Sequence, residues 1–131
     1  MDAYTTPGAF SWNELMTSDP EAALAFYTAL LGWKTQKMPM PGFDYHVVKV
    51  GETSVGGVMA MPPEAKAGGM PPNWGSYVTV SDVDATARKA VELGGQVAHG
   101  PADIPNVGRF AVIVDPQGAA LNVIAYTPPP G

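Results

Sequence analysis

The chain has 131 residues and no cysteine, which excludes disulfides, thiolate metal ligands and cysteine nucleophiles. Its formal net charge of -5 makes nucleic acid and anionic membranes poor partners, and no apolar run approaches the roughly 20 residues of a membrane span. The N-terminus lacks the basic and apolar regions of a signal peptide. We therefore predict one soluble, cytoplasmic domain that binds neither nucleic acid nor membranes.

The first half of the chain, residues 10–60, reads as one βαβββ module that follows a loosely held arm of residues 1–9. The expected elements are a strand over 10–16, a helix capped by Ser18 or Asp19 and ended by Gly32, and strands over 33–38, 45–50 and 53–59. Pro39 is expected to end the second strand, because proline offers no donor to a ladder. Gly56-Gly57 inside the last strand predicts a bulge or a close approach by another group.

The second half, residues 76–126, repeats this order after a linker over 61–75 that is rich in proline and glycine. Its expected elements are a strand over 77–80, a helix that follows Asp82 and ends at Gly94-Gly95, and strands over 96–99, 109–114 and 120–126. Residues 127–131 form a tail. The whole chain is thus predicted to be a single domain built from two modules.

A duplicated segment supports this division. Ser18-Asp19-Pro20-Glu21-Ala22 returns 63 positions later as Ser81-Asp82-Val83-Asp84-Ala85. Each copy follows a strand-like run and opens a helix-like run, and the terminal glycines Gly32 and Gly95 keep the same offset. A shared pattern at constant offset indicates internal duplication. We predict that residue n matches residue n plus 63 from Trp12 to Gly32.

Phe26-Tyr27, Leu31-Gly32-Trp33 and Asp115-Pro116-Gln117-Gly118 occur in an order that resembles the vicinal oxygen chelate superfamily, over roughly residues 10–126. That superfamily includes glyoxalase I, bleomycin-resistance proteins and extradiol dioxygenases, and the chain looks like a glyoxalase-like branch of it. The resemblance implies an α+β fold, in which two βαβββ modules form a cup-shaped mixed sheet with the active site inside the cup. It also implies a homodimer, because related single-domain members commonly pair.

Metal-using members of that superfamily hold a divalent ion with four side chains, usually His, Glu or Gln. The resemblance places these positions at Trp12, Met59, Gly75 and Asn122, and the offset of 63 relates the first pair to the second. Tryptophan and glycine offer no side-chain ligand, a methionine thioether is soft, and only Asn122 could coordinate weakly. We therefore predict no metal and no cofactor.

Glu14 is the candidate catalytic residue, because alternation places it on the same face as Trp12, and that face is expected to line the cup. A carboxylate beside Trp12 and Met16 should have a raised pKa, which suits a general acid or base near neutral pH. The alternative is that Glu14 pairs with an arginine or a backbone group and only orders its strand. The predicted ligand-binding residues are Trp12, His46, Tyr77 and Asn122, although a single histidine is more often structural.

These residues leave three functions open. The first is a protein that binds a small organic molecule in the cup and acts as a metal-independent lyase or isomerase with Glu14 as acid or base. The second is a metal-dependent glyoxalase or an extradiol-type dioxygenase. The third is a drug-binding protein of the bleomycin-resistance type, without catalysis. Neither the substrate nor the presence of a reaction follows from the sequence.

Overall fold

The computed structural model describes residues 1–127, so the predicted tail lies outside the described residues except for Thr127. The described chain forms two compact units. One consists of Trp12–Gly75, and the other combines Met1–Ser11 with the described residues that follow Gly75. Each unit holds one βαβββ module, which confirms the predicted α+β class and the pair of modules. No helix among the described residues is long and apolar enough to cross a lipid bilayer.

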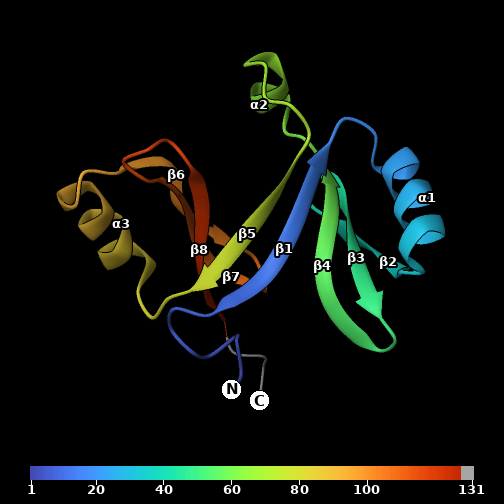
Figure 1. Ribbon diagram of the computed structural model, residues 1–131, viewed down its shortest axis with the longest axis horizontal. Coiled ribbons are helices and arrows are strands. Elements are labelled where there is room, and N and C mark those ends of the chain that lie inside the picture. The colour runs from blue at the N-terminus through green and yellow to red at the C-terminus, as the bar shows by residue number, and fades with distance from the viewer. Residues whose placement is uncertain (128–131) are drawn as a thin grey trace. The chain divides into compact units, whose positions relative to one another are not determined.

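The first module contains β1 (Phe10–Thr17), α1 (Pro20–Leu31), β2 (Lys34–Met40), β3 (Phe43–Val50) and β4 (Thr53–Ala60). Its strands lie in the order β2-β3-β4-β1, with β1 and β4 parallel and the other neighbours antiparallel. The helix α1 packs against this half-sheet (Figure 1). Contrary to expectation, β2 continues through Pro39, which is tolerated because β2 is the edge strand of the module.

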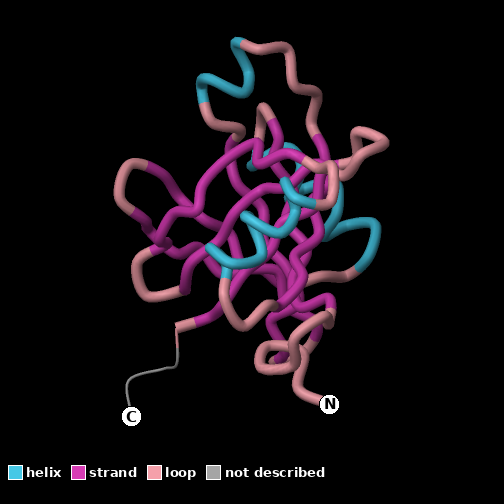
Figure 2. The backbone as a smooth tube through the Cα atoms, turned by 90° about the vertical axis from the view of Figure 1, so that its left-hand side faces the viewer, coloured by secondary structure: helices cyan, strands magenta, loops and turns pink. Residues whose placement is uncertain are grey.

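The second module contains β5 (Asn73–Thr79), α3 (Val83–Glu92), β6 (Gln96–Ile104), β7 (Gly108–Val114) and β8 (Ala120–Tyr126). Its strands lie in the order β5-β8-β7-β6, and α3 contacts the last three of them. Between the modules, the stretch predicted as a linker includes a short helix, α2 (Pro63–Ala67). Figure 2 shows how large a share of the chain is strand. The helix α2 forms because a proline at its first position precedes residues with good helix propensity.

The two main helices begin with the same cap. The Asp19 carboxylate accepts a hydrogen bond from the Ala22 amide at 3.1 Å, and Asp82 accepts one from the Ala85 amide at 3.0 Å. Both caps fulfil the prediction, and they keep the offset of 63. The helix α1 ends at Gly32, whose φ of 71° is the left-handed conformation that glycine adopts readily.

In each module the first strand pairs with the last, and the sequence separation of the paired residues differs by two between the modules. In the first module Asn13 pairs with Gly56, 43 positions later, whereas in the second Tyr77 pairs with Asn122, 45 positions later. The offset of 63 therefore holds for the first strand and the helix and does not extend to the last strand. A step of two keeps every side chain on its own face of the sheet. In the ladder, Asn122 stands beside Tyr77 as Gly57 stands beside Glu14.

The N-terminal arm is held more firmly than predicted. Gly8 donates a backbone hydrogen bond to Thr79 at 2.8 Å, and the Thr79 amide donates to Ala9 at 2.9 Å. The Thr79 hydroxyl donates to the Ala3 carbonyl at 2.6 Å, and the Tyr4 ring meets Tyr126 edge to face. The arm is thus tied to the second module by backbone pairing that its polar composition does not reveal.

Each module has its own hydrophobic core between the sheet and the helix. In the first module Val58 is fully buried with Leu15, Leu24 and Val48. Replacing Val58 with alanine should lower the free energy of unfolding by about 2 kcal/mol, because two buried carbons are lost and a cavity remains. Urea denaturation would measure this. Val50→Ala is the matched control, since Val50 is 57% exposed and the change should stay within about 0.5 kcal/mol.

Candidate functional site

Three polar side chains of the first module form a chain of hydrogen bonds on the face of the half-sheet opposite α1. The Trp12 indole Nε1–H donates to the Tyr45 hydroxyl at 2.9 Å. That hydroxyl donates in turn to Oε2 of Glu14 at 2.7 Å. Glu14 is 9% exposed, so its carboxylate is held in a mostly buried position by a phenol. A hydroxyl bond of this length fixes the orientation of the acid.

Gly57 makes this arrangement possible. It pairs with Glu14 on one side and with Val47 on the other, so its missing side chain lies on the same face as Glu14. A Cβ at this position would collide with the ring and hydroxyl of Tyr45. Tyr45 therefore lies across β4 over Gly57 to reach Glu14 on β1. The predicted close approach at Gly56-Gly57 is thus real, and Tyr45 is the approaching group on this face.

The structure separates His46 from Glu14 and Trp12. His46 follows Tyr45 in β3, so its side chain is on the opposite face of the half-sheet, toward α1. It is 7% exposed, and its Nε2 lies 3.9 Å from Oε1 of Glu21 in the first turn of α1. The histidine is therefore placed among the contacts of the helix, and it does not share a face with the predicted catalytic carboxylate.

The other two predicted ligand-binding residues belong to the second module and are neighbours there. Tyr77 on β5 pairs with Asn122 on β8. Tyr77 is buried, and the Asn122 side-chain amide donates to the Ser76 carbonyl at 3.2 Å. Alternation in both strands places the two side chains on one face. The second module thus presents a phenol and an amide at the ladder position where the first module presents Glu14 and Gly57.

The donor set at the four positions that the resemblance assigned to a metal does not fit a divalent ion. The Trp12 indole N–H is used as a donor to Tyr45, and Gly75 has no side chain. Met59, which offers a thioether, was assigned through the offset of 63, and this was wrong because the counterpart of Asn122 in the ladder is Gly57. The Asn122 amide nitrogen already donates to Ser76. One amide oxygen and one soft sulfur do not make the nitrogen and oxygen shell that zinc, nickel or iron requires. Over residues 1–127, no group of three or more His, Asp or Glu side chains is placed to hold a metal.

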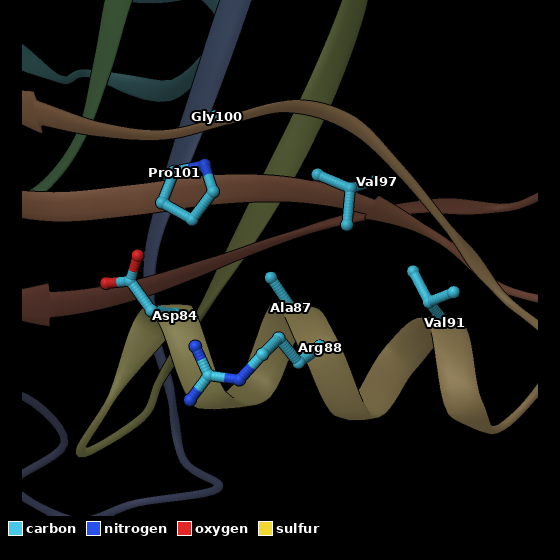
Figure 3. A pocket seen from close by; sticks show the side chains of 7 residues that line it. All are labelled: Asp84, Ala87, Arg88, Val91, Val97, Gly100 and Pro101. Carbon is cyan, nitrogen blue, oxygen red and sulfur yellow. The ribbon is translucent and has the colours of Figure 1, made fainter.

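Each module contains a hollow, and Glu14 lines neither of these two. One, of about 170 Å³, lies in the first module and has Trp33 and Trp74 among its walls. The other, of about 260 Å³, lies between α3 and β6 (Figure 3). Its lining is mainly apolar, and Asp84 and Arg88 on α3 supply its charges. None of the predicted site residues lines this second hollow.

Asp84 beside that hollow is paired with Arg109. Two nitrogens of the guanidinium donate to its two carboxylate oxygens at 2.8 and 3.0 Å. Hydrogen bonding from Arg109 holds the pKa of the Asp84 carboxyl below its ordinary value. Asp103 accepts a further bond from Arg109 at 3.1 Å. The paired charges join the start of α3 to β7.

This pairing should make the stability of the protein depend on pH. A carboxyl whose pKa is lower in the folded state stabilises the fold above its unfolded pKa of about 3.9, and this contribution is lost as the pH falls through the folded pKa. The melting temperature of Asp84→Asn should therefore lie below that of the wild type near pH 6, and the two should converge toward pH 2. Melting curves across this range measure it. Parallel curves would contradict the assignment.

Sequence reasoning missed Tyr45, the residue that connects Trp12 to Glu14. Two signals pointed to it. Alternation along β3 puts Tyr45 and Val47 on one face, and a glycine within a strand often marks the close approach of another group. What could not be read from the sequence was the register of β3 on β4, which decides that Tyr45 lies over Gly57.

Relatives of the chain are found among curated proteins. A Mycobacterium bovis protein named "Putative glyoxylase CFP32" is 48% identical over 122 residues, which cover 92% of this chain and 45% of that protein. The anthracycline biosynthesis protein DnrV of Streptomyces peucetius is 40% identical over 118 residues, which cover 90% of this chain and 42% of the relative. The chain therefore spans less than half the length of these relatives.

Solved structures share the fold. The crystal structure of methylmalonyl-CoA epimerase from Mycobacterium tuberculosis matches with a TM-score of 0.68 at 17% identity, over 95% of this chain and 92% of that one. A hypothetical protein from Bacillus halodurans matches with a TM-score of 0.73 at 14% identity, over 96% and 99% of the two chains. At such identities the likeness concerns the fold. A family model matches residues 9–123, and the chain belongs to the Glyoxalase/Bleomycin resistance protein/Dioxygenase superfamily.

Proposed function

We propose that the chain binds a small organic molecule beside Glu14 and transfers a proton on it, as a lyase or isomerase that uses no metal. The observation that carries this proposal is the 2.7 Å hydrogen bond from Tyr45 to the mostly buried Glu14 carboxylate. A carboxylate that is oriented before the substrate arrives needs little reorganisation in the transition state. The Trp12–Tyr45–Glu14 chain is the feature of the first module that has this property.

The proposed chemistry starts from a carbon acid next to a carbonyl group. The Glu14 carboxylate takes the proton from that carbon, and the electron pair of the broken C–H bond moves into an enolate. Return of the same proton to another carbon gives an isomer, whereas departure of a group with its bonding electrons from the neighbouring carbon gives a lyase product. Throughout, Tyr45 donates its hydrogen bond to the carboxylate and Trp12 holds Tyr45 in place.

The relatives support a small organic substrate. One group of relatives is named for glyoxylase activity and another for the biosynthesis of anthracyclines, and proteins of both kinds match at least 90% of this chain. Because each relative is more than twice as long as the matched segment, the activity of the whole relative is transferred here only as part of this proposal. Tyr77 and Asn122 are proposed as ligand-binding residues of the second module. A homodimer and a cytoplasmic location complete the proposal.

The proposal is tested by hydrogen exchange in deuterated water, followed by NMR. The probes are methylmalonyl-CoA and the adduct of an α-ketoaldehyde with a thiol, because both have an acidic C–H next to a carbonyl. The protein should accelerate exchange of that hydrogen well above the rate in buffer. Thermal shift with the same probes reports binding separately, since a ligand raises stability according to its concentration over its dissociation constant. Binding of a probe without exchange would instead support a drug-binding protein without catalysis.

A further inference from the structure

A line of methionines crosses the first module beside Glu14. The strands β2, β3, β4 and β1 are neighbours in this order (Figure 1). Their ladder pairs connect four residues into one line across the half-sheet, which are Met38, Tyr45, Met59 and Met16. Residues that pair across adjacent strands present their side chains on the same face. We call these four residues the methionine row, and it holds three of the seven methionines of the chain.

The methionine row lies next to Glu14 on the same face of the half-sheet. Met16 follows Glu14 by two residues in β1, so alternation keeps both side chains on one face. Met59 follows Gly57 in the same way in β4. Tyr45 belongs to the row, and its hydroxyl reaches the Glu14 carboxylate at 2.7 Å. Two residues of a strand span about 7 Å, so a molecule that lies on the row reaches the carboxylate with one end.

The second module provides an internal comparison. Its corresponding row lies two positions beyond Tyr77, as the methionine row lies two positions beyond Glu14. That row consists of Thr79, Ile124, Phe110 and Ala102. Thr79 and Ile124 are each 3% exposed, and the N-terminal arm covers Thr79. In the first module, by contrast, Met38 is 45% exposed and the other two methionines are half-buried.

This contrast indicates that the methionine row is a binding surface. Buried strand positions normally carry β-branched residues, as Thr79 and Ile124 do, because these suit the pleated surface. A methionine side chain is unbranched and polarizable, so it adapts its shape to a partner and makes favourable contacts with aromatic rings. The row crosses three inter-strand spacings, or about 14 Å. Phe43, which is 40% exposed and pairs with Met40, extends the same face by one more row.

We propose that the methionine row binds the flat aromatic ring system of a ketone and brings the C–H next to its carbonyl group to Glu14. The inference rests on the proposed function and names its substrate class. The row carries no charged side chain, which favours an uncharged ring system because a buried charge needs a partner. Thioethers contact the rings, and the carbonyl end of the ketone lies toward Tyr45 and Glu14.

A matched pair of ketones tests the ring preference. The probes are acetylnaphthalene and acetyldecalin, substituted at the same ring carbon. They share one carbon skeleton, but acetyldecalin is saturated and not flat. Burial of apolar area alone would make the saturated ketone bind at least as tightly. Titrations followed by NMR should show acetylnaphthalene binding at least about 10-fold more tightly, because several sulfur–aromatic contacts add together. Equal affinities would overturn the proposal.

The methionine methyl groups report where the ring lies. In the wild type with labelled methionines, the ring current of acetylnaphthalene should move the methyl signals of Met16, Met38 and Met59. Met70 is the matched control, because it is 46% exposed, like Met38, and lies outside the strands. Single Met→Leu variants assign the signals. Row signals that stay in place, or that move no more than the Met70 signal, would contradict the proposal.

Leucine variants test the role of the thioethers. Met16→Leu, Met38→Leu and Met59→Leu combined keep the apolar volume of the row, and swaps of this kind are well tolerated. They should bring the affinities of the two ketones within about 2-fold of each other, because the sulfur–aromatic contacts are lost. Met70→Leu should leave the preference unchanged. A triple variant with the full preference would overturn the role of the row, and the wild-type methyl signals test it even if this variant fails to fold.

The outcomes separate the ring surface from the proton transfer. Glu14→Gln should bind acetylnaphthalene with unchanged affinity, because the ring rests on the methionine row. Binding on the row without exchange of the acetyl hydrogens in deuterated water would retain this surface and overturn the proposed proton transfer. Exchange of the smaller probes, with row signals that acetylnaphthalene does not move, would retain the proton transfer and overturn this surface.

Discussion

Glu14→Gln is expected to reduce the rate of probe exchange by about 10²- to 10⁴-fold, the range that a positioned general acid or base contributes. The amide keeps the shape of the carboxylate and can still accept the hydrogen bond from Tyr45, but it cannot take up a proton at neutral pH. The loss should therefore fall on the turnover number, while the affinity for the probe changes little. NMR-detected exchange under saturating probe measures it.

Two further variants sharpen this result. Glu52→Gln removes an exposed carboxylate from the turn between β3 and β4 and should leave exchange unchanged. Tyr45→Phe keeps the ring over Gly57 and removes only the hydroxyl, so it should slow exchange by about 10-fold through a less well-oriented carboxylate. Full exchange activity in Glu14→Gln would show that another group carries the proton, and would overturn the proposed role of Glu14.

Gly57→Ala should lower the free energy of unfolding by about 3 kcal/mol and disrupt the site at the same time. The new methyl group would occupy the place of the Tyr45 ring, which would have to swing away and give up its bonds to Glu14 and Trp12. Overpacking costs about 1–3 kcal/mol, and each lost hydrogen bond costs about 1 kcal/mol. The lower conformational freedom of the unfolded chain stabilises the protein by about 0.4–1 kcal/mol. The two costs together outweigh that gain, and urea denaturation measures the result.

A double-mutant cycle identifies the cause. With Tyr45 already replaced by alanine, the methyl group at position 57 has no ring to displace. The same Gly57→Ala change should then raise the free energy of unfolding by about 0.4–1 kcal/mol, because only its effect on the unfolded chain remains. An equal cost in both backgrounds would mean that the methyl group meets the backbone, and Tyr45 would not be the reason for this glycine.

Most of the fold could be predicted from signals between residues close together in the sequence. The Asp19 and Asp82 caps, the stop at Gly32 and the strand Ala120–Tyr126 were predictable because each depends on residues close together in sequence. The prediction that Pro39 ends its strand was wrong, since whether a strand can hold a proline depends on its being an edge, which is a property of the sheet. The N-terminal arm was misjudged for the same reason, because its partner Thr79 is about 70 positions away.

The candidate site was predictable only in part. Alternation along β1 placed Trp12 and Glu14 on one face, and the structure joins them through Tyr45. His46 was predicted beside them because it is a titratable residue on a nearby strand. The face of the sheet on which His46 lies depends on which residues of β3 pair with which residues of β4. The sequence does not reveal that register.

The two-residue step between the ladders of the modules bears on how a duplicated half acquires new chemistry. A shift of one residue would turn the core side chains of the strand toward water, whereas a shift of two leaves the core composition intact and brings a different pair of side chains together. Tyr77 and Asn122 are neighbours on one ladder, and Glu14 and Gly57 are neighbours on the other. Insertions in even steps therefore allow two descendants of one ancestral half to place different side chains beside the first strand, a glycine in one and an amide in the other, without rebuilding the interior.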